Sequence, residues 1–186
     1  MRLRSPAACL VLALTFSAGP LQAQAWGWSV GLGGGVTIPT GDLGEAAGTG
    51  WHTGVAIEWR RVGAPWGLRI SGDFHRFGLS DDLGVDGNIE LWRWSGDFLW
   101  HFGGSENLQP YVLGGLGYVN ADVEVNEAPV GVVSVPTEGR LDIIGGVGAV
   151  IPMGGKLGVN LEARYELATG DGGDITYIPL SVRIRF

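Results

Sequence analysis

The side chains that could do chemistry in this chain are three histidines, several serines and many carboxylates. His75 and His101 are expected near opposite ends of two successive strands, which at about 3.3 Å per residue separates them by roughly 20 Å. Zinc ligands lie about 2 Å from one ion, so this pair predicts no zinc site. His52 could approach His75 at one rim, which leaves a two-histidine site open beside the simpler interpretation of hydrogen-bonded histidines.

Nucleophilic catalysis would need a serine within hydrogen-bonding reach of a histidine, on a face that the substrate can reach. The alternation places three serines, Ser71, Ser95 and Ser181, on the same strand face as the charged residues and not on the apolar face. Carboxylates on that phase are interspersed with arginines, so we interpret them as ion-pair partners rather than acid–base dyads. The sequence therefore predicts no catalytic residues and no enzyme.

Phosphate, calcium and thiol chemistry also lack their motifs. Gly154-Gly-Lys156 is not a phosphate-binding loop, because Val150 stands where the earlier glycine is required. The acidic stretch Asp81–Asn88 is not an EF-hand loop, since Gly84 and Arg93 occupy two of its ligand positions. The single cysteine, Cys9, falls in the leader described next, so the mature chain is expected to have no disulfide and no thiolate metal site. We predict no cofactor and no metal.

The first 25 residues have the pattern of a secretory signal peptide. Arg2 and Arg4 precede an apolar run, Ala7–Ala18, which Gly19-Pro20 ends before the small-x-small sequence Ala23-Gln24-Ala25. The alternative is an N-terminal anchor, but this run is too short to cross a bilayer, which needs about 20 residues. We expect cleavage after residue 25 and one domain over residues 26–186.

The composition of the remaining chain excludes several classes of protein. Glycine accounts for 34 of 186 residues without a collagen period, which indicates tight turns and closely packed strands. The net charge is −7, and it becomes more negative once Arg2 and Arg4 leave with the leader. An acidic chain without a basic run predicts no nucleic-acid partner.

Alternation of apolar and polar residues predicts eight strands, because successive side chains of a strand point to opposite faces. The pattern is cleanest between Leu157 and Leu167, where apolar residues alternate with Gly158, Asn160, Glu162, Arg164 and Glu166. The predicted strands are Trp26–Ile38, Trp51–Arg60, Trp66–Phe77, Asn88–Phe102, Gln109–Val125, Thr137–Ile151, Lys156–Ala168 and Tyr177–Phe186.

Strand length, strand number and aromatic placement together indicate a transmembrane barrel. Strands of 9–11 residues or more can cross the hydrocarbon, and single-chain bacterial barrels have an even number of them. The first, third, fifth and seventh connections are longer than the others. Aromatic residues gather at strand ends as two expected girdles: Trp26, Trp28, Trp59, Trp66, Trp100, Tyr111 and Phe186 at one rim, and Trp51, Phe74, Trp92, Trp94 and Tyr177 at the other.

Three loose motifs and the last strand carry a family resemblance. They are Val36-Thr-Ile-Pro-Thr-Gly-Asp42, Gln109–Tyr118, Glu162-Ala-Arg-Tyr165, and the apolar alternation that ends in Phe186. The chain resembles the small eight-stranded bacterial outer-membrane β-barrel domains of the OmpA, OmpX and OmpW type. The resemblance implies an all-β, antiparallel up-and-down transmembrane barrel in the outer membrane, with both termini in the periplasm. It also implies contact with membrane lipid and lipopolysaccharide, recognition of the last strand by the barrel assembly machinery, and a monomer.

Alternation alone does not say which phase faces outward, and a soluble lipocalin-type barrel would reverse it. We predict apolar residues outside, because the polar phase is nearly balanced in charge and enclosed ions must be paired. Its cations are Arg60, Arg69, Arg93, Arg140, Arg164, Arg183 and Arg185, and its anions Glu58, Asp73, Asp97, Asp122, Glu124, Asp142, Glu162 and Glu166. These residues are expected to plug the lumen, with the inward glycines of the first strand making room for arginine side chains.

Two segments do not fit this pattern cleanly. In the strand Gln109–Val125 we place Tyr111, Leu113, Val119, Ala121, Val123 and Val125 on the lipid face, which leaves Val112, Leu116 and Tyr118 on the polar face. The stretch between Pro129 and Pro136 is rich in valine for a loop tip. It could extend the barrel as a hairpin or present an apolar strip to a partner.

The expected function is an integral outer-membrane barrel with a structural or surface-interaction role and a plugged lumen. Passage of small apolar solutes, as suggested for OmpW-like barrels, is the alternative within the same fold. A lipid A-modifying enzyme is a further alternative, because some eight-stranded barrels have that activity. Such an enzyme would need a histidine on the lipid face, where the alternation places none.

Overall fold

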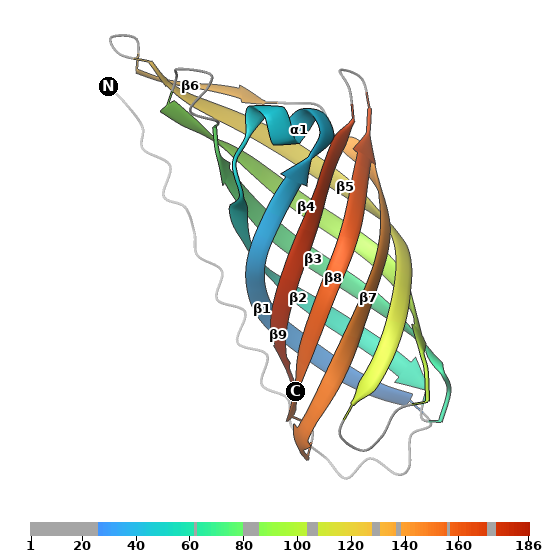
Figure 1. Cartoon of the computed structure of the whole chain (residues 1–186). Coiled ribbons are helices and arrows are strands. Elements are labelled where there is room, and N and C mark those ends of the chain that lie inside the picture. Colours follow the sequence, from blue (N-terminus) through green and yellow to red (C-terminus); the bar gives the residue numbers. More distant parts are fainter. Residues whose placement is uncertain are drawn as a thin grey trace, which may run out of the picture.

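Nine strands and one short helix form the part of the chain that the computed structural model describes, which is residues 26–61, 63–79, 86–103, 108–127, 131–136, 139–155, 157–170 and 174–186. Figure 1 shows the long strands tilted around a closed barrel. The elements are β1 (Trp26–Thr40), α1 (Gly41–Ala46), β2 (Gly50–Arg61), β3 (Trp66–Gly78), β4 (Asp86–His101), β5 (Gln109–Glu127), β6 (Gly131–Pro136), β7 (Arg140–Gly154), β8 (Leu157–Thr169) and β9 (Ile175–Arg185).

Eight of these strands close into a ring of antiparallel neighbours. Each pairs with the next long strand along the chain, and β1 pairs with β9 to complete the circle, from Gly31 opposite Arg185 to Thr40 opposite Thr176. The remaining strand, β6, pairs with the end of β5, and Figure 1 shows this hairpin projecting beyond the barrel. A closed ring leaves no strand edge without hydrogen-bond partners, as a wall in lipid requires.

The eight predicted strands are all present, with ends that differ by a few residues. Residues 131–136 of the valine-rich stretch form β6 and pair with β5, which is the first of the two alternatives, a hairpin that extends the barrel. The first long connection contains α1, where only a loop was expected. The helix in the described ranges, α1, has six residues, so it is too short to span a bilayer, and these ranges contain no candidate membrane-spanning helix. The predicted signal peptide lies outside the described residues.

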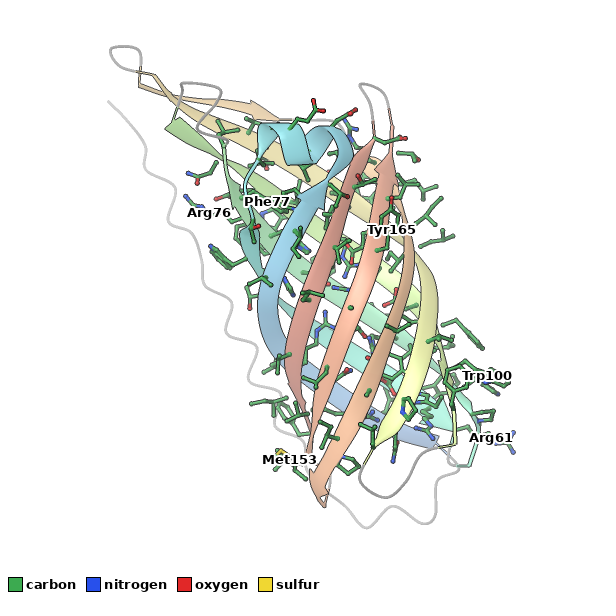
Figure 2. All side chains as sticks on the ribbon, in the orientation of Figure 1. Arg61, Arg76, Phe77, Trp100, Met153 and Tyr165 are labelled. Atoms are coloured by element: carbon green, nitrogen blue, oxygen red, sulfur yellow. The ribbon has the colours of Figure 1, made fainter. Side chains whose placement is uncertain are left out.

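The apolar phase faces outward, and the soluble-barrel alternative is therefore wrong. In β8 the exposed fraction of Leu161 is 43%, whereas that of its neighbour Glu162 is 5%. Charged side chains are buried and apolar ones exposed along β2, β3, β4, β7 and β9 as well. Figure 2 shows Trp100 and Met153 projecting away from the barrel wall. Such a surface is the reverse of a soluble protein's and suits contact with lipid acyl chains.

The predicted facing of β5 is wrong over its described side chains. Tyr111, Leu113 and Val119 are buried inside the barrel, while Leu116 and Tyr118 are more than half exposed on its outer wall. Asp122 shares the outward phase of Tyr118, so it does not belong to the lumen charges with which it was grouped. The side chains of Glu124 and Val125 lie outside the described set.

Two tyrosines predicted for the aromatic girdles also point inward. Tyr111 is 1% exposed, and its hydroxyl lies 2.7 Å from Asn160 Oδ1. Tyr177 is fully buried, and its ring lies 5.2 Å from that of His75 between centroids. Both therefore act as lumen residues. Trp51, Trp92 and Trp94 do lie exposed on the outer wall as predicted.

Glycines of β1 allow the barrel to close tightly. A Cβ atom at Gly33 would collide with the backbone carbonyl of Val182 and lie 2.8 Å from Cγ of Arg183. A Cβ at Gly35 would collide with the carbonyl of Leu180. The prediction that these glycines make room for arginine holds at Gly33, but the nearest atoms belong to the β9 backbone. The glycines thus serve first to bring β1 and β9 together.

Candidate functional site

The middle of the lumen is organised around Asp73, which comes from β3. Its carboxylate accepts hydrogen bonds from Arg93, from Nη2 of Arg164 at 3.3 Å and from Nη2 of Arg183 at 3.0 Å. These arginines come from β4, β8 and β9, so one carboxylate joins four strands. Across from it stands Gly54, where a Cβ would collide with the Asp73 carboxylate. The absence of a side chain at this position makes room for the cluster.

Glu162 of β8 forms a second centre beside the first. It pairs with Arg69, with Nη1 of Arg183 at 2.8 Å and with Nε of Arg164 at 3.4 Å. The Tyr111 hydroxyl lies 2.5 Å from its Oε2 atom. Arg164 and Arg183 contact both Asp73 and Glu162, so the two centres form one network.

The network continues toward both ends of the barrel. On one side, Glu166 Oε1 lies 3.1 Å from Arg93 Nη1 and 3.1 Å from Arg164 Nε. On the other, Glu58 Oε2 lies 3.2 Å from Arg69 Nη2, and Glu58 Oε1 lies 3.4 Å from Arg185 Nη1. Buried ions are stable only when paired, and these pairs satisfy one another across the lumen.

The buried charges nearly balance, as predicted. Six carboxylates and five arginines are buried among the described residues: Glu58, Asp73, Asp97, Asp142, Glu162 and Glu166, with Arg69, Arg93, Arg140, Arg164 and Arg183. A small void of about 10 Å³ lies beside Glu58, Arg69 and Arg183, which is room for about one water molecule. The prediction of a lumen plugged by side chains is confirmed.

An apolar cluster covers the charged network at the end where α1 lies. Leu43 of α1 packs with Phe77, Leu91, Val119 and Tyr177, all of which are buried. Figure 1 shows α1 lying across this end of the barrel. The described part of the lumen thus has an ionic layer in the middle, an apolar cluster beneath α1, and a second apolar cluster toward the other end that comprises Leu99, Tyr111, Leu113, Ile144 and Val150.

The two histidines predicted to approach each other do so, through a shared hydroxyl. Thr37 Oγ1 lies 2.9 Å from Nδ1 of His52 and 3.0 Å from Nδ1 of His75. The two imidazole rings stack with centroids 5.1 Å apart. Within the described residues no group of three or more histidine, cysteine or acidic side chains is arranged to hold a metal ion. The contacts are those of hydrogen-bonded structural histidines.

Serine and histidine also meet inside the barrel. Ser181 Oγ lies 2.8 Å from His52 Nε2, and both residues are buried. Ser71 and Ser95 lie 2.8 Å apart between their hydroxyl oxygens, on the lumen side as predicted. The Ser181–His52 pair faces away from lipid, so it does not form a hydrolytic site on the outer wall.

A closed ring with apolar residues outside and paired ions inside is the design of a bacterial outer-membrane barrel. The family model described as "Outer membrane protein beta-barrel domain" matches residues 8–186. The chain belongs to this family. It is an integral outer-membrane β-barrel domain with a side-chain-plugged lumen.

Solved outer-membrane barrels share the fold. Neisserial surface protein A matches with a TM-score of 0.64 and 14% identity, over 87% of this chain and 98% of that one. Ail, the attachment invasion locus protein of Yersinia pestis, in complex with the heparin analogue sucrose octasulfate, matches with a TM-score of 0.51 and 18% identity, over 86% of this chain and 97% of that one.

An enzyme is also among these barrels. The outer membrane enzyme PagL matches with a TM-score of 0.51 and 12% identity, over 85% of this chain and 98% of that one. At such identities the likeness extends to the fold alone. No curated protein matches this outer-membrane barrel.

Proposed function

We propose that this outer-membrane barrel has a structural or surface-interaction role and is neither a channel nor an enzyme. The observation that carries the proposal is the filled lumen, in which Asp73 and Glu162 each bind several arginines. A barrel with this interior leaves the loops as the parts that can differ in function between relatives.

The proposed orientation places both termini in the periplasm. β1 begins and β9 ends at the same rim, where the connections from β2 to β3 and from β7 to β8 are short. Figure 1 shows α1 and the β5–β6 hairpin at the opposite rim. Long extracellular loops and short periplasmic turns are usual for this class of barrel. We further propose a monomer in contact with lipid and lipopolysaccharide, delivered by a cleaved signal and inserted through recognition of the strand ending in Phe186.

The chemistry of the outer loops favours a cationic partner. Asp42 and Glu45 are exposed on α1. The other long connections carry Asp81, Asp82, Glu138, Asp171 and Asp174. Ail was captured with a heparin analogue, which is a polyanion. Acidic loops would repel such a ligand, so we propose that any partner at this surface is basic or is bridged by cations.

A non-enzymatic role is supported by the position of the Ser181–His52 pair. Both side chains are buried in the lumen, where His52 also contacts the Thr37 hydroxyl. A lipid-hydrolysing enzyme must bring its nucleophile to a lipid substrate, and the described wall separates the two. The fold likeness to PagL, at 12% identity, does not transfer that enzyme's activity.

Purified protein in liposomes is expected to show no solute passage above that of empty liposomes. The filled lumen leaves no path for solutes, so swelling in small sugars and uptake of a small apolar dye are both expected to match the background. A porin in the same vesicles verifies that the assay detects passage. Dye uptake above background would support the OmpW-like alternative and contradict a closed lumen.

A further inference from the structure

A hollow of about 310 Å³ opens at the rim where the chain termini of the barrel lie. Its lining includes Arg60 from β2, Pro65 from the β2–β3 turn, His101 at the end of β4 and Gln109 at the start of β5. The hollow therefore lies where two short connections meet, below the ionic layer of the lumen.

Arg60 brings a positive charge to this hollow and forms no ion pair within 4 Å with a described carboxylate. Its Nε donates to the Ala64 carbonyl at 3.3 Å, and its Nη1 donates to Gln109 Oε1 at 3.4 Å. Both partners are neutral. By contrast, five other arginines each lie within 4 Å of at least one carboxylate: Arg69, Arg93, Arg164, Arg183 and Arg185.

The nearest lumen carboxylate is already engaged. Glu58 lies two residues before Arg60, so the alternation of β2 directs both side chains to the same face. It is contacted by Arg69 at 3.2 Å and Arg185 at 3.4 Å. Glu58 thus pairs directly with two other guanidinium groups, and Arg60 has no direct ion pair among the described residues.

His101 supplies to the same hollow a buried imidazole that makes no hydrogen bond to the described residues. Its exposed fraction is 4%, and neither ring nitrogen has a hydrogen bond within the described part of the chain. Nε2 lies 3.7 Å from Glu58 Oε1, which is beyond hydrogen-bonding distance. The backbone N–H of His101 donates to the Pro65 carbonyl at 2.5 Å, which fixes this residue beside the turn. A buried imidazole normally has its N–H satisfied.

We propose that the hollow binds a small oxyanion, a phosphate or carboxylate group, between Arg60 and His101. A guanidinium fork binds two oxygens of such a group, and the imidazole N–H can donate to a third or to one of these two. The same group completes the hydrogen bonds of His101 and neutralises Arg60. The exposed aromatic rings of Trp100 and Phe102 lie at this rim, the level at which lipid headgroups meet the barrel. The oxyanion can come from a phospholipid headgroup or from free phosphate.

The test uses refolded protein in maltoside micelles, which carry no phosphate of their own. The probes are short-chain phosphatidylglycerol, counted by native mass spectrometry, and inorganic phosphate, titrated at constant ionic strength by calorimetry. Arg60→Gln is the test variant, Arg60→Lys retains the charge, and Arg61→Gln is the matched control. Arg61 is exposed, and Figure 2 shows it pointing away from the barrel at the same end. A heat-shift gel verifies that each variant is folded.

Wild type and Arg61→Gln are expected to bind one anion with the same affinity. Arg60→Gln is expected to bind it at least about tenfold more weakly, which is the loss of affinity usual for removing a hydrogen bond to a charged group. Arg60→Lys is expected to retain part of the affinity. If phosphatidylglycerol binds and phosphate displaces it only weakly, the site is one for a lipid headgroup. If inorganic phosphate binds as tightly as the lipid, the site is one for a free anion. Absence of binding of both probes to wild type, or equal losses in Arg60→Gln and Arg61→Gln, would overturn the proposal.

Discussion

Asp73→Ala is expected to lower the free energy of unfolding by about 3–5 kcal/mol, the usual cost of removing one partner from a buried ion pair. Asp73 is fully enclosed and accepts hydrogen bonds from Arg93, Arg164 and Arg183. Without it three guanidinium groups are left facing one another in a space without bulk water. Their remaining carboxylate contacts are with Glu162, Glu166 and Asp142, and Glu162 is also paired with Arg69.

The measurement is reversible urea unfolding in lipid vesicles, followed by tryptophan fluorescence. Asp174→Ala is the control, because Asp174 is an exposed residue just before β9 and its loss is expected to change stability by less than about 0.5 kcal/mol. An equal midpoint for Asp73→Ala and Asp174→Ala would mean that the lumen network does not stabilise the fold.

Val182→Arg is expected to destabilise the inserted barrel by about 2–4 kcal/mol, because a charge near the membrane midplane loses its hydration. Val182 is 53% exposed on the outer wall, where it lies opposite Leu161 in β8 and opposite Gly34, a residue near the middle of β1. The arginine side chain has no partner there, since its neighbours on this face are apolar.

Met153→Arg is the matched control for the lipid face. Met153 is 67% exposed at the β7–β8 turn, and Figure 2 shows it at the end of the barrel, where water is within reach. The same charge there is expected to cost less than about 1 kcal/mol. The same unfolding assay compares both variants. If both lost the same stability, the position of Val182 in the hydrocarbon would be contradicted.

The alternation of apolar and polar residues predicts most of this fold, because successive side chains of a strand point alternately to the outer wall and to the lumen. It succeeds in β8, where Leu161 and Glu162 have opposite surroundings. It fails in β5, where both phases carry apolar residues. The inward phase supplies Val119 and Ala121 to the apolar cluster under α1, and the outward phase becomes polar at Asn120 and Asp122 toward the β6 hairpin. The large apolar side chains of Leu116 and Tyr118 are the feature of the sequence that indicates which phase of β5 faces outward.

Other features depend on tertiary contacts that a single strand pattern does not contain. α1 has six residues, two of them glycine, and is held by Leu43 packed against Phe77 and Tyr177. The aromatic character of Tyr177 predicts a place in a girdle, whereas its phase, shared with Ser181 and Arg183, predicts the lumen position that it occupies. The charged composition of the lumen was predictable, but the partners were not. Which arginine meets Asp73 depends on the stagger between strands that are distant in sequence.

The central claim is that acyl chains contact the apolar phase while the paired ions are sealed inside. A lipid-soluble carbene reagent, photolysed in vesicles that contain the wild-type protein and mapped by peptide mass spectrometry, tests this directly along β8. We expect label at Leu161, Ala163, Tyr165 and Leu167, and little at Glu162, Arg164 or Glu166. Preferential labelling of Glu162 and Arg164 would show that the barrel faces the other way and would contradict the account.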